Sequence, residues 1–388
     1  MTRVAIIHEW LVKPGGSEQV LGHLARLFPQ ADIFPLVWRP GIEAQYGIAP
    51  GRIHPSCMQR WPGSRKFYKA LLPFYPSAVE GHDLRDYDLV IANHHCVAHG
   101  ARPGAGAPLV SYCHTPMRYA WDLRAEYLAA AGLDTGMRGH LINRQLDRLK
   151  KWDSAAGARA TALFGNSAHT AARAQRAYGR AADFIYPAVA LERFYRPASA
   201  PARGDHFLVV SRLVAYKRIE QAIEFCRTQG APLRIVGDGP ERKKLEALAR
   251  GLPVQFLGRL PEGELIAEFQ QARALLCPGE EDFGLSAVEA FAAGCPILHG
   301  GSGGFAEIAT AVLDDSGSAL TLANFAADPK AGAARLAAAG AMLAAPENRV
   351  RLEALFGLPR FFSQIRTQIA QVAGADAVKH ASAPAPRS

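Results

Sequence analysis

The fold is decided by residues 274–299, which read ALLCPGEEDFGLSAVEAFAAGCPILH. A short apolar run leads into an acidic loop, a second apolar stretch covers 285–294, and a third run covers 296–299. This order predicts a buried strand, a turn at Gly284, a helix that ends at Gly294 and a further parallel strand. The loop would follow the carboxyl end of a strand and lie beside the free amides of a helix N-terminus, a position that attracts phosphate.

The same alternation of short apolar runs and helical patterns extends over most of the chain. In the second half, strands are expected at 207–210, 233–236, 254–257, 274–277 and 296–299, with helices at 217–229, 240–250, 261–271 and 285–294. In the first half, strands are expected at 4–7, 32–38, 88–96, 109–113, 161–164 and 184–189, with helices at 17–28, 64–74, 138–158 and 168–178. The fold class is therefore α/β, with two Rossmann-like domains whose strand ends face a cleft.

The domain boundaries follow from changes in composition. We expect an N-terminal domain at 1–195, a Pro- and Ala-rich linker at 196–205 and a second domain at 206–345, of which 305–345 is poorly patterned. A helical segment at 346–374 carries Phe361, Phe362, Ile365 and Ile369 at helical spacing, and it is expected to pack back on the first domain. Residues 375–388 are expected to form a disordered tail.

Composition excludes several classes of protein. Of the 388 residues, 49% are hydrophobic and 20% are charged, which is typical of a globular protein. There is no apolar run of about 18 residues, so no membrane span is expected, and the six cysteines are scattered, which favours free thiols in the cytoplasm. The net charge of +9 is not concentrated in a nucleic-acid-binding module, so phosphates or a membrane surface are the expected partners. No metal site is expected; Asp86-Tyr-Asp88 reads as a turn before a strand.

Two cations and two carboxylates carry the expected chemistry. Arg212 and Lys217 flank a turn from strand to helix, where they suit a diphosphate. Glu281 and Glu289 are eight positions apart, so the first lies in the loop and the second two helical turns later, where they suit sugar hydroxyls. Taken singly, each pair also fits solvated surface charges.

Together these residues resemble the retaining glycosyltransferases of the GT-B fold, and more narrowly glycosyltransferase family 4. Supporting motifs are Gly15-Gly-Ser-Glu18, His114 within Tyr112-Cys-His-Thr-Pro-Met-Arg118, Val236-Gly-Asp-Gly-Pro240, Phe256-Leu-Gly-Arg259 and Gly303-Gly-Phe-Ala-Glu307. The resemblance spans roughly residues 1–310. The sequence from Leu72 to Tyr119 is similar to that of bacterial mannosyltransferases of O-antigen and exopolysaccharide assembly. The chain departs from the family pattern after Glu307 and at Ser286-Ala287, which affects boundaries and sugar specificity most.

The resemblance implies roles for named residues. It places Arg212, Lys217, Glu281 and His114 at the catalytic site, with the two cations on the donor diphosphate and His114 on the transferred sugar. It implies donor binding by Gly15, Gly16, Arg212, Lys217, Arg259, Leu260, Glu281, Asp282, Phe283, Gly284, Leu285 and Glu289, with Glu289 on the ribose. Gly16 would let the N-terminal loop approach the diphosphate closely. The resemblance implies a nucleotide-sugar co-substrate and neither a cofactor nor a metal.

The expected function is transfer of a hexosyl unit with retention of configuration. The interpretation favours mannose from GDP-mannose and a polyprenyl-diphosphate-linked saccharide acceptor in surface polysaccharide biosynthesis. Three alternatives stay open: a UDP-sugar donor, a sugar-nucleotide epimerase of similar two-domain fold, and a non-catalytic sugar-nucleotide-binding protein. Basic stretches at 60–75 and 138–159 would hold the protein on the anionic inner face of the cell membrane, and solvated amphipathic helices are the alternative there.

Overall fold

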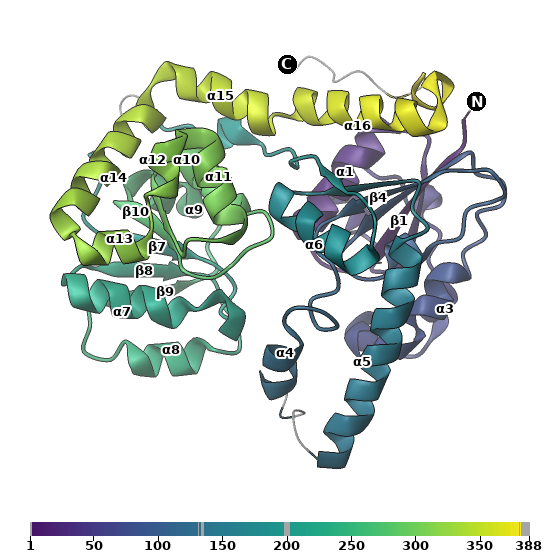
Figure 1. Ribbon diagram of the computed structural model, residues 1–388, viewed down its shortest axis with the longest axis horizontal. Helices are drawn as coiled ribbons and strands as arrows, with labels where there is room; N and C mark the ends of the chain where they lie inside the picture. The colour runs from purple at the N-terminus through teal and green to yellow at the C-terminus, as the bar shows by residue number, and fades with distance from the viewer. Residues whose placement is uncertain (1, 131, 133–135, 198–201, 380, 382–388) are drawn as a thin grey trace. The chain divides into compact units, whose positions relative to one another are not determined.

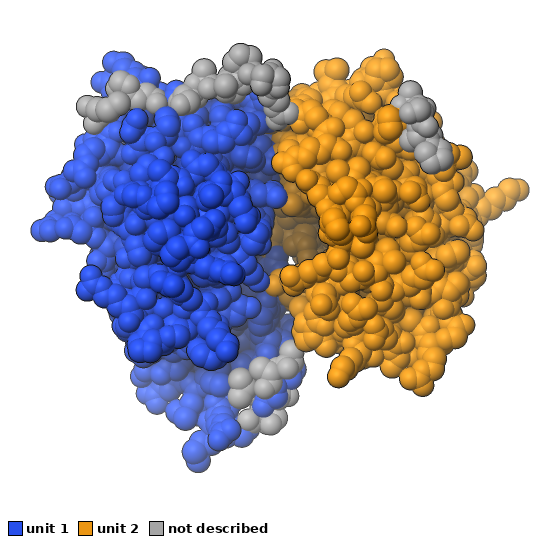
Figure 2. Space-filling model, turned by 180° about the vertical axis from the view of Figure 1, so that it is seen from behind, with its two compact units in different colours: residues 1–188, 358–388 blue, residues 189–357 orange. Residues whose placement is uncertain are grey.

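The computed structural model describes residues 2–130, 132, 136–197, 202–379 and 381. It divides into two compact units, one of residues 1–188 and 358–388 and the other of residues 189–357 (Figure 2). Within the described residues, each unit has one parallel sheet with helices around it (Figure 1). The expected α/β fold with two Rossmann-like domains is confirmed.

In the part of unit 1 that the structure describes, six parallel strands run in the order β2-β1-β3-β4-β5-β6. They are β1 (Val4–Leu11), β2 (Asp32–Trp38), β3 (Leu89–His94), β4 (Leu109–Cys113), β5 (Ala162–Gly165) and β6 (Asp183–Phe184). The chain passes from β1 outward to β2 and then returns to the other side of β1 for β3. The connections that follow β1 and β3 therefore lead in opposite directions along the sheet. This creates a switch point between the two strands, the place where ligands bind in open α/β sheets.

Alternating side chains of this sheet build a core on each of its faces. Ile6 packs with α1 on one face, and Ile7 packs with α3 on the other. The helices of unit 1 are α1 (Gly16–Leu27), α2 (Ser64–Phe67), α3 (Tyr75–Glu80), α4 (Arg124–Ala130), α5 (Gly136–Gly157), α6 (Ala168–Tyr178) and α16 (Leu358–Ala373). Short 3-10 turns are η1 (Glu43–Tyr46), η2 (Pro50–Arg52), η3 (Cys57–Arg60), η4 (Tyr68–Phe74), η5 (Ala98–Gly100) and η8 (Ala375–Val378).

The described residues of unit 2 form a five-stranded parallel sheet in the order β11-β10-β7-β8-β9. Its strands are β7 (Phe207–Val210), β8 (Leu233–Val236), β9 (Val254–Gly258), β10 (Ala274–Cys277) and β11 (Ile297–His299). Its helices are α7 (Ile219–Gln229), α8 (Arg242–Leu248), α9 (Glu262–Gln271), α10 (Leu285–Ala292), α11 (Gly303–Leu313), α12 (Asp315–Ser318), α13 (Leu322–Ala327), α14 (Pro329–Ala344) and α15 (Pro346–Phe356), with 3-10 turns η6 (Leu191–Arg193) and η7 (Ala215–Lys217). Here the switch point lies between β7 and β10.

The last helix, α16, packs on unit 1, as the sequence predicts. Phe361, Phe362, Ile365 and Ile369 are buried in the same core as the apolar face of α1 (Figure 1). The Phe361 ring stands edge-on to Tyr112 at 6.0 Å between centroids. Burying each of these side chains contributes about 1.5–3 kcal/mol, so the chain that leaves unit 1 near residue 188 is anchored there again at its end.

Several boundaries differ from those expected. The segment 346–374 is two helices in different units, because Gly357 ends α15 in an extended conformation and Pro359 begins a new helix at α16. Along the chain, the boundary between the two units falls between residues 188 and 189 rather than at 195. Four residues of the predicted linker, 198–201, lie outside the described residues. The poorly patterned region 305–345 holds α11 to α14.

Two further expectations need correction. The run 184–189 forms a strand only at Asp183–Phe184, because Pro187 cannot donate to a strand ladder. The predicted tail begins with the ordered turn η8, where Ala377 is buried and the Thr2 hydroxyl donates to the Asp376 carbonyl (3.2 Å). Residues 380 and 382–388 are not described. Among the helices that are described, none combines the length and apolar character needed to cross a bilayer.

Candidate functional site

The predicted donor-binding residues of unit 2 lie in loops at one edge of its sheet. Arg212 follows β7, Arg259 and Leu260 follow β9, and the acidic loop with Glu281 follows β10. Backbone hydrogen bonds tie these loops together: the Leu213 amide donates to the Asp238 carbonyl (3.1 Å). The Gly304 amide, in the loop after β11, donates to the Glu281 carbonyl (2.7 Å). At the carboxyl edge of the sheet, the loop after β7 is therefore joined to the loop after β8, and the loop after β10 to the loop after β11.

Lys217 and Glu281 form an ion pair at the switch point between β7 and β10. Their side chains are 12% and 22% exposed, so the pair is half-buried yet accessible. Gly279 permits this approach, since a Cβ there would lie 2.7 Å from the Lys217 carbonyl oxygen. Arg212 lies at the same turn, is exposed, and donates from Nη2 to the Tyr216 hydroxyl (2.7 Å). The structure thus brings a cation and a carboxylate of the predicted site into contact, and it leaves the second cation, Arg212, exposed at the same turn.

The acidic loop ends at the N-terminus of α10. Gly284 has φ +98°, a conformation that favours glycine, and a Cβ there would lie 2.8 Å from the Phe305 ring. Asp282 and Phe283 are buried, and Leu285 is half-buried at the first position of the helix. Gly284 has no side chain to cap α10. The first backbone amides of α10, together with the dipole of the helix, therefore provide a site suited to an anion.

Glu289 is a half-buried acid about one turn along α10. Burial raises the pKa of its carboxyl to about 8, the charge of Glu262 acts in the same direction, and Arg193 opposes it. Arg193 and Glu262 form an ion pair, and α10 contacts both η6 and α9, which carry them. Arg259 is exposed and Leu260 half-buried in the segment between β9 and α9. Glu289 therefore lies on the α9 side of α10, whereas Glu281 lies at the switch point.

In unit 1, the glycine loop leads from β1 into α1. Gly15 is confined, because a Cβ there would lie 2.5 Å from Glu18 Oε2. Gly16 is different: no described atom lies within 4 Å of a Cβ built on it. Packing within the chain therefore explains why residue 15 is a glycine. It does not explain the glycine at position 16, where the close approach of a ligand would be a reason.

His114 directly follows β4, in contact with residues that the sequence did not single out for this role. Its Nε2 lies 2.7 Å from the carboxamide oxygen of Asn93, at the end of β3. Burial lowers the pKa of His114 to about 3, and the positive charges of His95 and His8 act in the same direction. The imidazole is therefore neutral at pH 7. The sequence does contain a signal for this pair, because β3 and β4 are neighbouring strands and a polar residue lies at the end of each.

Other polar residues at this edge are buried in networks. Glu9 Oε1 accepts from the amides of His95 (3.1 Å), Cys96 (2.9 Å) and Ala98 (3.1 Å), so Glu9 holds the loop after β3. His99 contacts Asp153 of α5, with 3.1 Å between Nε2 and Oδ1. Across the residues that the structure describes, no group of three or more His, Cys, Asp or Glu side chains has an arrangement that could hold a metal ion.

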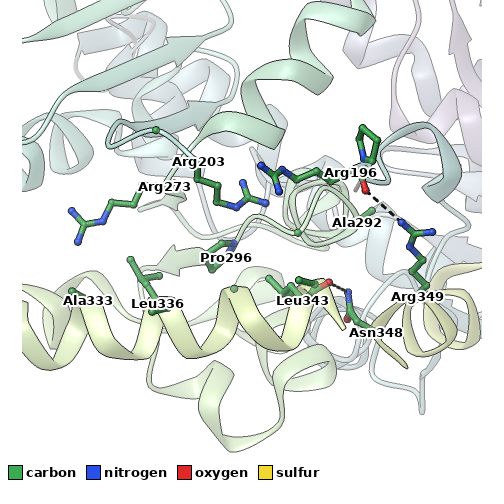
Figure 3. Close-up of a pocket in the computed structure, with 16 residues that line it drawn as sticks. Arg196, Arg203, Arg273, Ala292, Pro296, Ala333, Leu336, Leu343, Asn348 and Arg349 are labelled. Atoms are coloured by element: carbon green, nitrogen blue, oxygen red, sulfur yellow. Dashed lines mark hydrogen bonds between the residues drawn. The ribbon is translucent and has the colours of Figure 1, made fainter. Parts of the chain in front are cut away.

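A pocket of about 600 Å³ lies at the opposite edge of the sheet in unit 2 (Figure 3). Gly204, Arg273 and Pro296 line it, and they precede β7, β10 and β11. The α14 residues Leu336 and Leu343 form an apolar wall. The Arg203 guanidinium donates to the backbone carbonyls of Phe269, Gln270, Ala272 and Ala293. The lining residues include none of the predicted donor-binding residues, so this pocket is separate from the predicted site.

Two family models match adjoining segments of the chain. Residues 14–193 match the model described as Glycosyltransferase Family 4, and residues 194–317 match Glycosyl transferases group 1. Among curated proteins, 90 residues are 40% identical to the GDP-mannose-dependent alpha-(1-6)-phosphatidylinositol dimannoside mannosyltransferase of Mycobacterium tuberculosis, covering 23% of each chain. A stretch of 162 residues is 34% identical to glycogen synthase of the same organism, covering 37% of this chain and 38% of that one. The matched segments thus span well under half of these relatives.

The fold as a whole matches that of solved structures. The structure of HepE from Anabaena in complex with UDP has a TM-score of 0.65 to this chain at 18% identity, and the match covers 96% of this chain and 100% of that one.

Proposed function

We infer that the chain is a glycosyltransferase of the GT-B type, because two adjoining glycosyltransferase models match residues 14–317 and its fold is that of HepE. The observation that carries the proposal for the site is the contact between Lys217 and Glu281 at the switch point of the second sheet. A cation beside a carboxylate fits a ligand with a charged diphosphate and a hydroxyl-rich sugar. The matched models describe glycosyltransferases, so they give no support to an epimerase.

The proposed chemistry is cleavage of the anomeric C–O bond of a nucleotide sugar. The bonding electrons go to the departing diphosphate, and the sugar ring gains positive character. An acceptor hydroxyl oxygen then bonds to the anomeric carbon, and its proton goes to the departing diphosphate or to water. Lys217, Arg212 and the first amides of α10 would neutralise the diphosphate more strongly in the transition state than in the ground state. Glu281 would hold a sugar hydroxyl and Glu289 the ribose, with Arg259 and Leu260 near the base. No enzymic nucleophile and no metal are assigned, and transfer with retention stays a prediction.

The donor we propose is GDP-mannose. One relative is named as GDP-mannose-dependent, whereas the HepE structure contains UDP, so a UDP-sugar is the rival within the same class. Thermal-shift titration with GDP-mannose, UDP-glucose, UDP-N-acetylglucosamine, GDP and UDP, each with and without EDTA, separates the two. A guanine preference that persists in EDTA is expected. A uracil preference would replace the donor, and no shift with any of the five would refute the site.

Gly16→Ala provides a test that separates ligand binding from folding. We expect stability equal to or slightly above that of the wild type, since the added Cβ meets no described atom and alanine favours a helix. Affinity for GDP-mannose should fall about tenfold, because the Cβ would intrude on the diphosphate. Calorimetric titration measures this. Gly340→Ala in α14, whose Cβ also meets nothing described, is the matched control and should bind normally. Equal affinity in the two variants would remove Gly16 from the donor site.

We also propose that unit 1 binds an anionic membrane surface, where a polyprenyl-linked acceptor would be reached. Arg60, Arg65, Lys66 and Lys69 are exposed among the exposed aromatic residues Trp61, Phe67 and Phe74. The long helix α5 (Figure 1) begins with exposed Met137 and Leu141 beside Arg138 and Arg144. Aromatic and basic side chains in one surface are typical of membrane-interface binding.

Co-sedimentation with vesicles containing phosphatidylglycerol tests the membrane proposal. Lys66→Gln/Lys69→Gln should weaken binding about 30-fold at low salt, because each charge near an anionic surface contributes about 1 kcal/mol. Lys243→Gln/Lys330→Gln removes two exposed charges from unit 2 and should leave binding unchanged. If the wild type stays in the supernatant at low salt, the chain acts on its acceptor without a lipid surface of this kind.

A further inference from the structure

Asn93 joins three elements of unit 1 through a single buried side chain. It lies at the end of β3 and is fully buried. Its Nδ2 donates to the Ser17 carbonyl in the first turn of α1 (2.9 Å) and lies 3.2 Å from His8 Nδ1 on β1. Its Oδ1 lies 2.7 Å from His114 Nε2, just after β4. The carboxamide, at the end of β3, therefore connects the first turn of α1 with His114.

These contacts determine which way the carboxamide points. If the amide were turned over, its oxygen would face the Ser17 carbonyl oxygen, and two acceptors would meet in a buried site without a proton between them. The oxygen must therefore face His114. An amide oxygen only accepts, so His114 carries its proton on Nε2, and its Nδ1 holds a lone pair.

The other end of the network is held by an ion pair. His8 Nε2 lies 3.6 Å from Glu18 Oε1, and Glu18 Oε2 accepts from the Ser17 hydroxyl (3.0 Å). Burial alone would lower the pKa of His8, but hydrogen bonding to Glu18 and the charge of Glu18 outweigh it, so the pKa is raised. Although burial opposes it, the contact with His8 lowers the pKa of Glu18 to about 2. The pair fixes the first turn of α1 against β1, and His8 Nδ1 donates to the Asn93 backbone carbonyl (3.0 Å), which holds the backbone of Asn93 beside them.

We propose that Asn93 is a positioning residue: it holds His114 as the Nε2–H tautomer, so that Nδ1 accepts a hydrogen bond from a sugar hydroxyl. This rests on the proposed role of His114 at the transferred sugar. A lone pair at Nδ1 repels phosphate oxygens and attracts hydroxyl hydrogens. His114 therefore recognises the sugar and not the diphosphate, and Asn93 contributes to telling a nucleotide sugar from the nucleoside diphosphate that remains after transfer.

The first arm of the test is a double-mutant cycle on that selectivity. For the wild type, Asn93→Ala, His114→Ala and the double variant, calorimetry gives the ratio of affinities for GDP-mannose and GDP, with UDP-glucose and UDP in parallel. Each single variant should lower the ratio about five- to tenfold, the worth of one hydrogen bond, and the double variant no further. A further loss on adding Asn93→Ala to His114→Ala would show that Asn93 does not act through His114, which overturns the proposal.

The second arm needs no substrate. In protein labelled with ¹⁵N-histidine, the His114 signals, assigned by their loss in His114→Ala, should show a protonated Nε2 and an unprotonated Nδ1. Asn93→Ala should give a tautomer mixture. Asn348→Ala removes another buried carboxamide, one that donates to the Leu343 carbonyl (3.1 Å), and should leave His114 unchanged.

The two arms separate two kinds of failure. If the wild type binds none of the four nucleotides, the proposed function fails while the NMR arm still tests the tautomer. An unprotonated Nε2 in the wild type, or an unchanged His114 tautomer in Asn93→Ala, overturns the role of Asn93 whatever the donor is.

Discussion

Replacing Lys217 with alanine is expected to lower the rate of sugar transfer by about 10²–10³, the loss typical of removing one preorganised group that stabilises developing charge. Two effects add. The diphosphate loses a cation at the moment when it gains negative charge. The Glu281 carboxylate also loses the Lys217 ammonium and repels the departing group. Both effects grow along the reaction, so kcat should fall more than KM rises.

The control for Lys217→Ala is Lys243→Ala, which removes an exposed lysine on α8. It should leave kcat, KM and the melting temperature unchanged. Arg212→Ala is a second test at the same turn, and because Arg212 is exposed it should lower the rate without destabilising the fold. Steady-state kinetics with GDP-mannose, or with the donor that thermal shift selects, measures all three. Near wild-type rates in both Lys217→Ala and Arg212→Ala would disprove the assignment.

Most of the second sheet could be predicted because β7, β8, β10 and β11 are largely buried on both faces. Such strands appear as short continuous apolar runs, and β7, β8 and β10 occupy the predicted residues. The loops that follow them then share one edge by topology alone, which is why Glu281 and Lys217 could be expected to meet. Sequence spacing could not show that they form an ion pair, because that depends on how closely Gly279 lets the two loops approach.

What could not be predicted depends on contacts between distant parts of the chain. The polar network of unit 1 joins His8, Glu18, Asn93 and His114, which share no motif and no spacing. His8 and Glu9 belong to no complete sequence motif that would indicate their role. Gly357 and Pro359 locally separate α15 from α16. That the chain passes from unit 2 back to unit 1 at this point follows from the packing of α16 against α1, which involves distant residues.

Replacing Glu289 with glutamine is expected to stabilise the protein and weaken donor binding. The folded-state pKa of Glu289 is about 8, above the ordinary value of 4.5. The folded state therefore binds a proton that the unfolded state releases, and stability falls as pH rises from 4.5 to 8. Below 4.5 the acid is neutral in both states. Glutamine has no proton to lose, so Glu289→Gln should unfold like the wild type at pH 4.5 and resist unfolding better by about 3 kcal/mol at pH 7.

Urea unfolding of wild type and Glu289→Gln at pH 5 and pH 8 measures this difference. Glu347→Gln, which changes an exposed carboxyl on α15, is the control and should show the same small difference at both pH values. A Glu289→Gln variant that gains nothing between pH 5 and pH 8 would mean that α9 and η6 do not keep water from the Glu289 carboxyl.

Ionised Glu289 lowers the stability of the folded protein, and donor binding would explain why the residue is present if its carboxylate holds the ribose diol. An ionised carboxyl accepts from two hydroxyls at once, whereas glutamine offers one oxygen and places an NH₂ group at the other. Donor affinity should therefore fall about 10- to 100-fold in Glu289→Gln. For the wild type it should rise with pH toward 8, as the bound ribose favours the charged form. An acid whose pKa is strongly raised at a cost to the fold is typical of functional sites. If Glu289→Gln is more stable and binds the donor as tightly as the wild type, Glu289 has no part in the donor site.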